Sequence, residues 1–459
     1  MAKYEQYAKY KDSGVEWLGE IPSEWSISSI KYLSTLISTG GTPKNQISFT
    51  DEQEINWFTP SDFSGDFEIR TSAKYVTFDS VRCGESKLYP SNAILMIGIG
   101  ATLGKIAICK TDFSCNQQIN IIVPNKSVTL EFLAYSLIAQ LEQIKQSSNS
   151  STIGIINQDK TKQLVISLPA FIEQNQIIKY LDHETAQIDI LIAKQEKLIE
   201  LLKEKRQAVI SHAVTKGLNP DVTMKDSGVE WLGEVPEHWT VSKFKYFASI
   251  QGGFAFSSDL FIEEGTQVLR IGNVYQNSLS LERQPIFIAN DLVKNFQDFI
   301  VKKNDVLMSL TGTLGKRDYG FAIKVETDDQ YLLNQRVAKI SPNKNIDTDF
   351  MVYVLWSESY LTQLYSLPSG TKQANLSNSD VLGIEIVVPQ NMQEQKEIAR
   401  YIKEKLEKFD EMIAKAKSAI QLMQERRTAL ISSAVTGKID VRNWQAPHKN
   451  NKANTEKVA

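Results

Sequence analysis

Two long segments of this chain repeat one another, and both have the pattern of amphipathic helices. Residues 173–213 contain no proline or glycine, and their apolar residues recur at helical spacing. Residues 394–434 repeat this pattern 221 positions later, with the same Glu-Gln near the start and almost the same ending. A helix of this length would extend about 60 Å, which is more than one small domain can cover. The matched register therefore predicts that the two helices pack on each other.

The apolar stripes predict which residues form the helix–helix contact. They are Leu181, Ile188, Leu191, Ile192, Leu198, Leu202 and Val209 in the first helix, and Ile402, Phe409, Ile413, Ile420, Met423 and Leu430 in the second. The alternative is that each helix is an ordinary amphipathic helix that packs only on its own domain.

A second repeat precedes each globular segment. Residues 11–25 read KDSGVEWLGEIPSEW and residues 225–239 read KDSGVEWLGEVPEHW, with twelve of fifteen positions identical. Glycine and proline disfavour a helix here, and the tryptophans can serve as apolar anchors. We expect an irregular strap that packs near the base of the long helices; an exposed binding motif is the alternative.

The two repeats together predict a duplicated chain of α+β class. Each globular segment contains short strands, a helical stretch (residues 130–144 and 349–365) and a final strand that ends in proline before the long helix. The expected divisions are 1–25 and 218–239 for the framing segments, 26–170 and 240–390 for the globular domains, 171–217 for the central helical spacer, 391–440 for the C-terminal helix, and 441–459 for a disordered tail.

Composition restricts where the chain works and what it binds. The net charge is −3, and the two globular segments are nearly neutral, so binding to nucleic acid would require locally arranged positive charge. The N-terminal sequence lacks the apolar core of a signal peptide, and apolar runs such as Ala93–Ile97 are too short to span a membrane. Three cysteines without a CxxC pair fit a reducing cytoplasm, and four scattered histidines offer no zinc-ligand spacing.

Both globular segments contain Thr-Leu-Gly-Lys after an apolar strand. A nucleotide-binding P-loop is excluded, because Ile99 and Leu310 stand where its first glycine is required. A glycine-rich connection with hydroxyls and a lysine can still approach a phosphate backbone closely. The candidate residues for such contacts are Thr102, Lys105, Thr311, Thr313 and Lys316. A plain hairpin turn is the alternative.

Two further elements are shared by the segments. Asn116 and Gln117 match Asn334, Gln335 and Arg336, and amide and guanidinium groups can bind base edges in a bidentate manner, although polar strand ends are also common. The second element is Gly40-Gly41-Thr42-Pro43-Lys44, matched by Gln251-Gly252-Gly253-Phe254; Lys44 is a candidate contact, and a tight turn explains both sequences equally well.

Motifs for catalysis are missing from the sequence. It contains no methyltransferase cofactor loop with an Asn/Asp-Pro-Pro-aromatic motif, no nuclease-like acidic cluster with a following lysine, and no Ser/His/Asp or Cys/His set at a suggestive spacing. The sequence therefore indicates a binding protein.

The architecture resembles the specificity subunit of type I restriction–modification systems. The likeness rests on two divergent segments that each end in strand-Pro and a Glu-Gln-led helix, on Thr311-Gly312-Thr313-Leu314-Gly315-Lys316, and on the repeated KDSGVEWLGE block, and it extends to about Val441. The first segment departs from this pattern, with Ile97-Gly98-Ile99-Gly100-Ala101 before Thr102, which weakens a transfer of DNA contacts between the two segments.

The resemblance implies two target-recognition domains that are separated by paired helices. It implies that the helices form an antiparallel coiled coil with pseudo-two-fold symmetry, and that each domain reads half of a bipartite, asymmetric site in double-stranded DNA. It also implies assembly with two methyltransferase subunits and with restriction/translocase subunits. S-adenosylmethionine, ATP and Mg would be bound by those partners, which would perform adenine-N6 methylation or restriction, while this chain would be non-catalytic and hold no cofactor.

Two other classes of function remain open from the sequence. A duplicated protein-binding scaffold without DNA specificity would fit the nearly neutral charge. A nuclease with an unrecognised site is the enzymatic alternative. DNA binding by the chain with and without a methyltransferase would distinguish these possibilities.

Overall fold

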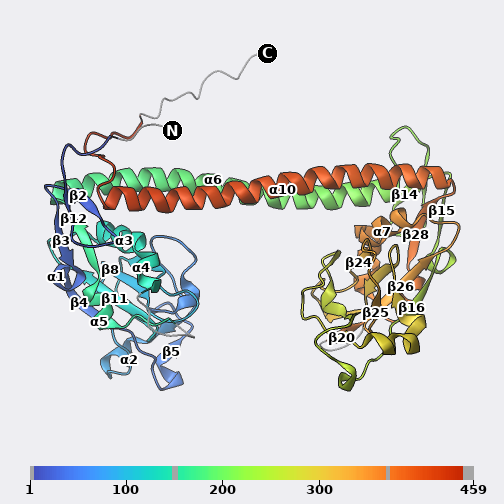
Figure 1. The fold of residues 1–459 in the computed structure, drawn as a ribbon, viewed down its shortest axis with the longest axis horizontal. Coiled ribbons are helices and arrows are strands. Elements are labelled where there is room, and N and C mark those ends of the chain that lie inside the picture. Colours follow the sequence, from blue (N-terminus) through green and yellow to red (C-terminus); the bar gives the residue numbers. More distant parts are fainter. Residues whose placement is uncertain (1–4, 147–153, 368–372, 448–459) are drawn as a thin grey trace, which may run out of the picture. The chain divides into compact units, whose positions relative to one another are not determined.

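The computed structural model describes residues 5–146, 154–367 and 373–447, and the chain divides into two compact units. Unit 1 comprises residues 1–195 and 418–459, and unit 2 comprises residues 196–417. The helices α6 (Phe171–Lys216) and α10 (Met392–Val435) each contribute one end to unit 1 and the other end to unit 2 (Figure 1).

Unit 1 is built around a four-stranded antiparallel sheet in the order β4-β11-β8-β9. The strands of this sheet are β4 (Ser34–Thr39), β11 (Ile119–Pro124), β8 (Ala93–Ile97) and β9 (Ile106–Cys109). A second sheet, in the order β10-β6-β7-β5, consists of β10 (Ser114–Cys115), β6 (Ile55–Phe58), β7 (Tyr75–Val76) and β5 (Phe49–Thr50). The remaining elements are β3 (Ser26–Ser29), β12 (Val165–Leu168), α1 (Ile30–Leu33), α2 (Phe78–Arg82), α3 (Leu130–Ala139), α4 (Leu141–Gln146), α5 (Gln158–Gln163), η1 (Gln46–Ser48) and η2 (Pro60–Asp62).

Unit 2 repeats this central sheet in the order β16-β26-β22-β24. Its strands are β16 (Ala248–Gly252), β26 (Val337–Pro342), β22 (Val306–Ser309) and β24 (Ala322–Lys324). The second sheet contains β20 (Phe287–Ile288), β17 (Thr266–Leu269), β25 (Tyr331–Leu333) and β21 (Ile300–Val301). The other strands are β15 (Trp239–Lys243), β28 (Glu385–Pro389), β18 (Val274–Tyr275), β19 (Ser278–Leu279), β23 (Thr311–Thr313) and β27 (Gln373–Asn375). The helices are α7 (Thr348–Trp356), α8 (Glu358–Ser366), α9 (Asn378–Gly383), η3 (Phe244–Tyr246), η4 (Ser258–Leu260), η5 (Ile271–Asn273) and η6 (Asn290–Phe299).

The sequence predicts a single helical stretch over residues 349–365, but the structure breaks it at Ser357. The Ser357 hydroxyl accepts a hydrogen bond from the Tyr360 backbone N–H and so caps the start of α8. A serine can satisfy backbone donors at a helix start, which makes it a common boundary between consecutive helices.

The two long helices pack antiparallel within each unit, as predicted. In unit 1 the start of α6 lies against the end of α10, where Arg427 donates to both carboxylate oxygens of Asp189 at 2.9 and 3.3 Å. In unit 2 the end of α6 lies against the start of α10, and Arg206 pairs with Asp410 at 3.6 Å. Apolar residues of both helices share one core cluster in each unit; they are Leu181, Ile188, Ile192, Met423 and Leu430 in unit 1, and Leu202, Val209, Ile402, Phe409 and Ile413 in unit 2.

Two residues predicted for this seam are wrong. Leu191 is 49% exposed and Leu198 is 38% exposed. The seam advances alternately by four and three residues, through Ile188, Ile192, Gln195, Ile199 and Leu202. Leu191 and Leu198 each lie one residue before a seam position, which turns them onto the flank of the helix.

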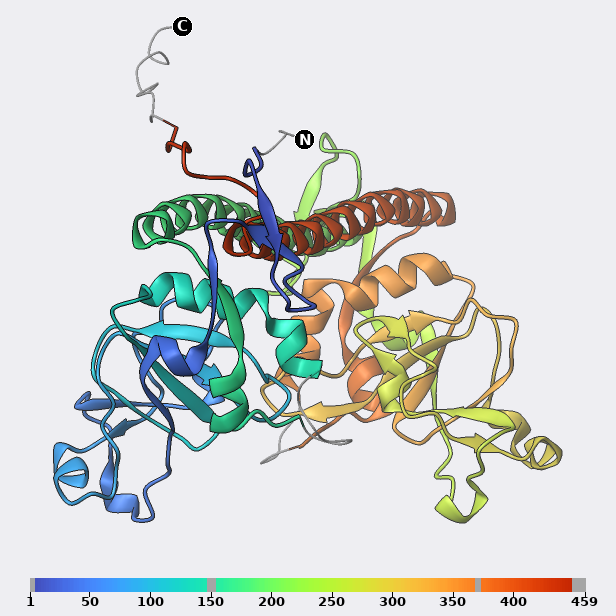
Figure 2. The same cartoon turned by 60° about the vertical axis from the view of Figure 1, so that its left-hand side comes forward.

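Each framing segment folds as a short antiparallel hairpin rather than an irregular strap. The hairpins are β1 (Tyr10–Asp12) with β2 (Glu20–Pro22), and β13 (Met224–Asp226) with β14 (Glu234–Pro236). In unit 1, Leu18, Ile21 and Trp25 are buried in the cluster that contains the end of α10, and Figure 2 shows this hairpin in blue beside that helix. Gly14 and Gly19 have φ of 68° and 62°, which explains the two glycines of the repeated block.

The Glu-Gln pair at the start of each long helix ties the preceding strand to the domain. In unit 2 the buried Gln395 amide donates to the Pro389 and Asn345 carbonyls, at 2.8 and 3.0 Å, and accepts from the Asp347 N–H at 2.7 Å. Gln174 does the same in unit 1, donating to the Pro169 carbonyl and accepting from the Thr129 N–H. Buried amides with several partners of this kind fix the angle at which strand and helix join.

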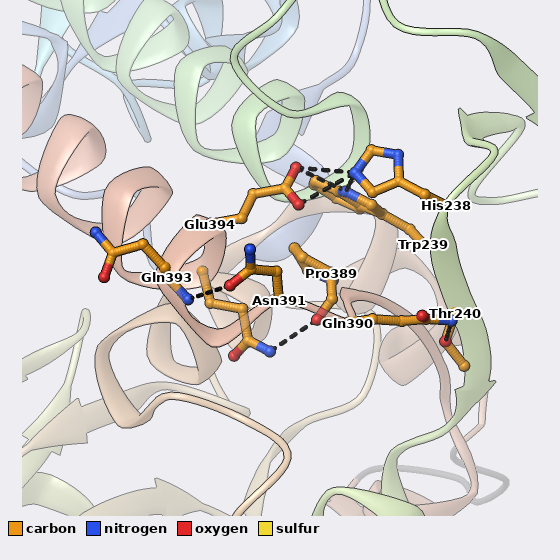
Figure 3. A network of polar contacts seen from close by, with 9 residues as sticks. His238, Trp239, Thr240, Pro389, Gln390, Asn391, Gln393 and Glu394 are labelled. Atoms are coloured by element: carbon orange, nitrogen blue, oxygen red, sulfur yellow. Dashed lines mark hydrogen bonds and ion pairs between the residues drawn. The ribbon is translucent and has the colours of Figure 1, made fainter.

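The glutamate of each pair binds the framing segment. Figure 3 shows Glu394 facing His238 and Trp239; the Trp239 indole N–H donates to its carboxylate at 3.0 Å. In the same region Gln390 donates to Thr240, and the Gln393 N–H donates to Asn391. Framing segment, last strand and long helix thus form one connected base in unit 2.

The expectation of a disordered tail from residue 441 is corrected for its first residues. Val441 is buried, the Gln176 side chain donates to the Val441 and Trp444 carbonyls, and the Trp444 ring packs edge-on against Tyr180. Val441, Trp444 and the Gln176 side chain together hold this segment on α6. Residues 448–459 lie outside the described residues.

Candidate nucleic-acid interface

In each unit a polar turn follows one strand of a parallel pair, and a glycine pair lies beside that turn. β10 runs parallel to β6 in unit 1, and β25 runs parallel to β17 in unit 2. Asn116 and Asn334 follow β10 and β25 directly. Because the carboxyl ends of parallel strands lie together, these turns share one edge with the residues that follow β6 and β17.

The glycine pair lies against this turn in both units. A Cβ atom on Gly40 would come within 2.2 Å of the Asn116 carbonyl oxygen, and one on Gly253 would come equally close to the Asn334 carbonyl. Gly40 therefore corresponds to Gly253, and both positions require glycine because two backbones touch there. The two shared elements that the sequence left separate form one site in each unit.

In unit 1 the turn residues have different roles. Asn116 is buried, and its side chain binds both the backbone N–H and the side chain of Gln118, at 3.0 Å each, so it shapes the turn instead of facing a ligand. Gln117 is exposed, and the Thr42 hydroxyl donates to its side-chain oxygen at 2.5 Å. This contact orients the Gln117 amide outward and leaves its NH₂ group to donate.

In unit 2 two exposed side chains project from the turn. The Gln335 N–H donates to the Phe254 carbonyl, and the Arg336 carbonyl accepts from the Leu310 N–H. Backbone contacts therefore hold the turn, while the Gln335 and Arg336 side chains have no hydrogen bond or ion pair to the described residues. An amide and a guanidinium presented in this way are suited to base edges or phosphates.

The Thr-Leu-Gly-Lys segments adopt different structures in the two units. In unit 1 the segment forms the hairpin connection between β8 and β9, and Gly98 at its start donates to the Gln118 carbonyl at 2.7 Å. Thr102 is half-buried and Lys105 is exposed on this hairpin. The segment is thus a hairpin turn, and its exposed lysine could still contact a phosphate.

In unit 2 the corresponding residues Thr311–Thr313 form β23, which pairs with β27. The Thr311 hydroxyl is buried and has no hydrogen-bond partner in the part of the chain that the structure describes, and Thr313 and Lys316 are exposed. The following Arg317 is not available to a ligand in the same way, since it pairs with Glu358 at 2.5 Å and lies over the Tyr365 ring. Lys44 of unit 1 is exposed, two residues beyond Thr42.

Two residues at the candidate interface, one aromatic and one basic, were not among the contacts predicted from the sequence. Phe254 is 37% exposed beside Gln335 and belongs to an aromatic group with Phe256, Phe296 and Phe299. Arg270 follows β17 at the edge where Asn334 follows β25. The Gly-Gly-Phe-Ala-Phe sequence could have indicated the first, whereas nothing local to Arg270 indicated the second.

The cysteines near the site act as packing residues. Cys109 and Cys115 are free thiols in one apolar cluster with Phe58 and Phe113. Burial raises the pKa of both thiols, so they stay protonated at neutral pH. The Cys115 sulfur also limits the space at Gly40.

Together, the two units define a duplicated α+β protein whose units each present an exposed amide-bearing turn and share one pair of antiparallel helices. Among the described residues, no three His, Cys, Asp or Glu side chains gather closely enough to hold a metal ion. The described helices include none with the length and apolar character needed to cross a membrane.

Comparisons with known proteins identify the family of this chain. The profile of the type I restriction modification DNA specificity domain matches residues 22–201 and 236–422. The chain belongs to this family.

The chain is similar to a type I restriction enzyme MjaVIII specificity subunit from Methanocaldococcus jannaschii, with 28% identity over 353 residues that cover 77% of this chain and 80% of the relative. A putative MjaX specificity subunit from the same organism is 25% identical over 473 residues, covering 95% and 99% of the two chains. A chain from a solved type I restriction–modification system superimposes with a TM-score of 0.66 at 13% identity, covering 90% of this chain and 98% of that one, which shows a shared fold.

Proposed function

We propose that this chain is the DNA specificity subunit of a type I restriction–modification complex, with each globular domain reading one half of a bipartite, asymmetric site. The observation that carries the proposal is the repeated site. In both units a glycine pair, a parallel strand pair and a polar turn combine to present exposed side chains capable of base contacts. Family membership supports the same function over a protein-binding scaffold without DNA specificity.

The proposed contacts divide into two kinds. Gln117, Gln335 and Arg336 are proposed base readers, because their side chains are exposed and their backbones are fixed. The proposed phosphate and positioning contacts are Lys44, Thr102, Lys105, Thr313 and Lys316. The predicted contact Thr311 is set aside because its hydroxyl is buried, while Asn116 shapes its turn through its side chain and Asn334 through its backbone. This division follows the general rule that phosphate contacts position a protein and base contacts give specificity.

We propose that the chain itself is non-catalytic and holds no cofactor. Two methyltransferase subunits would bind S-adenosylmethionine and methylate adenine N6, and restriction/translocase subunits would use ATP and Mg. The support is the sequence, which contains none of the motifs that these reactions need. A cytoplasmic location follows from this role.

Single alanine substitutions in the complex with the methyltransferase test the assignment. Gln335→Ala or Arg336→Ala should cost about 1–3 kcal/mol at one base pair and relax specificity there. Lys105→Ala or Lys316→Ala should weaken binding to all sequences alike and reduce its salt dependence. The exposed Lys87→Ala and Lys294→Ala variants are charge-matched controls and should change neither property. Specificity that is unaltered at every base pair in the Gln335 and Arg336 variants would contradict their role.

Exchanging residues 26–168 for those of a relative tests the independence of the two readers. Methylome sequencing should show one changed half-site and one unchanged half-site, because the repeated frames lie outside the exchanged segment. A change in both half-sites would exclude independent reading.

A further inference from the structure

Two short exposed motifs recur in both units although the globular segments have otherwise diverged. Lys31-Tyr32 returns as Lys245-Tyr246, in each case within a buried-exposed-exposed-buried run. Pro124-Asn125-Lys126 returns as Pro342-Asn343-Lys344. The motifs are about ninety residues apart in each segment, so the sequence does not suggest that they belong together.

The fold joins the two motifs into one surface in the same way in each unit. The Asn125 amide donates to the Tyr32 carbonyl and the Asn125 N–H donates to the Leu33 carbonyl, both at 2.8 Å. In unit 2, Asn343 makes the same two bonds to the Tyr246 and Phe247 carbonyls, again at 2.8 Å. We call this the lysine–tyrosine surface; its residues are Lys31, Tyr32, Asn125 and Lys126 in unit 1 and Lys245, Tyr246, Asn343 and Lys344 in unit 2.

Packing accounts for the asparagines but not for the lysines and tyrosines. Tyr32 is 70% exposed and Tyr246 is 59% exposed. Among the described residues, each ring contacts only the preceding lysine, whose ammonium lies 5.6 Å from the Tyr32 ring centre in unit 1 and 5.0 Å from the Tyr246 ring centre in unit 2. None of the four lysines forms an ion pair with the described residues. Exposed side chains that recur without a structural role point to a binding surface.

The lysine–tyrosine surface lies far from the candidate nucleic-acid interface within each unit. Tyr32 precedes β4, whereas Gly40 follows it; Asn125 follows β11, whereas Gln117 precedes it. These strands have six residues each, so the two surfaces are about 20 Å apart at the rise of an extended strand. In unit 2, β16 and β26 separate Tyr246 and Asn343 from Gly253 and Gln335 in the same way.

We propose that the lysine–tyrosine surface is a protein-docking surface that binds one copy of the same carboxylate-bearing partner on each unit. Its separation from the base-reading turn favours a protein over a DNA backbone, since phosphate contacts normally flank the bases being read. Tyrosine is enriched in protein interfaces, and the unpaired lysines call for partner carboxylates. Given the proposed function, on which this step rests, the partner present in two copies is the methyltransferase subunit.

Native mass spectrometry of the full-length chain co-expressed with its methyltransferase subunit tests the proposal. The wild-type chain should carry two copies. Lys31→Glu/Lys126→Glu and Lys245→Glu/Lys344→Glu should each leave one copy, and the quadruple variant should leave none, with at least a tenfold loss of affinity per unit. Lys9→Glu/Lys87→Glu has the same charge change at exposed positions of unit 1 and should keep both copies.

The outcomes separate this inference from the proposed function. If the wild-type chain binds no methyltransferase, the proposed function itself fails. If the quadruple variant keeps two copies, the docking surface is wrong while the proposed function stands. If it keeps two copies but loses affinity for all DNA sequences, the surface is a phosphate contact and the proposal is likewise overturned. A thermal transition matching that of the wild-type chain would show that loss of the partner does not come from unfolding.

Discussion

The same Glu-Gln pair lies near the start of both long helices, but the glutamate accepts its hydrogen bonds from different donors in the two units. In unit 2, Glu394 accepts from the indole N–H of Trp239 and contacts His238. In unit 1, Glu173 accepts instead from the Tyr7 hydroxyl at 2.7 Å, and the corresponding indole N–H of Trp25 is buried with no hydrogen-bond partner among the described residues.

The chain ends explain this difference. In unit 1 the framing hairpin is reached by the N-terminal residues, and the segment after α10 folds back onto them; the Asp440 N–H donates to the Glu5 carbonyl, and the Arg442 guanidinium lies over the Tyr7 ring. Trp444 covers Tyr180, which is 2% exposed, whereas the matching Tyr401 of unit 2 is 37% exposed. The two units therefore share the backbone arrangement at the start of the long helix. The side chains that contact the glutamate and the tyrosine there differ, because different chain segments lie next to them.

Removing the indole N–H should have the largest effect and should differ between the units. Trp239→Phe takes a donor from the Glu394 carboxylate, whereas Trp25→Phe removes a donor that has no partner. Hydrogen bonds to charged groups contribute about 1.5–3 kcal/mol, so Trp239→Phe should destabilise its unit by about that much more than Trp25→Phe. Hydrogen exchange at the first turns of α6 and α10 measures each unit separately. Equal effects would show that the two bases are equivalent after all.

Trp444→Ala should have the next largest effect, confined to unit 1. The half-buried indole covers Tyr180, and its loss should cost about 1–2 kcal/mol of local stability. Faster exchange is expected in the first turns of α6, with no change at the start of α10. Tyr401→Ala serves as the control, since this ring is already exposed and its removal should change little.

Asp440→Asn should have the smallest effect, and one that depends on pH. Partial burial opposes ionisation of Asp440, but the Arg442 guanidinium bound to it holds its pKa below the usual range. A carboxyl whose pKa is lowered by folding stabilises the folded state above its unfolded pKa, about 4, and this stabilisation is lost as the pH falls through the lower folded value. The variant should therefore cost under about 1 kcal/mol at neutral pH, and its difference from the wild-type chain should begin to shrink below about pH 4 and vanish once the pH is below the lowered folded pKa. Thermal unfolding across this range measures it, and the effect of Trp444→Ala should show no such pH dependence.

Much of the helical architecture was predictable because it depends on short-range periodicity. Residues such as Leu181, Ile188, Leu202 and Phe409 recur at seam spacing, so the pairing of the helices followed from the pattern. The errors came where periodicity alone is ambiguous. Leu191 and Leu198 are as apolar as their neighbours, and only the geometry of the pair shows that they lie on its flank.

The candidate site was predicted in pieces. Gly40, Gln117 and Lys105 were each recognised, but a sequence carries no sign that β11 pairs with both β4 and β8, which places the start of β11 between Gly40 and the hairpin that carries Lys105. The sequence also suggested the same role for Asn116 and Asn334, because both begin the polar turn. Only the hydrogen bonds of the folded turn show that Asn116 is occupied by Gln118.

By itself, the sequence determined the duplication, the two long helices with most of their contact residues, and the class of the protein, because these depend on repeats and on spacing within one segment. Tertiary structure alone decided which exposed residues act together. Lys31-Tyr32 and Asn125-Lys126 become one surface only when β4 and β11 pair, and Trp444 finds Tyr180 only when the end of α10 returns to the start of α6. Such contacts join residues about ninety or more positions apart, and long-range pairing is set by the packing of the whole unit rather than by any local pattern.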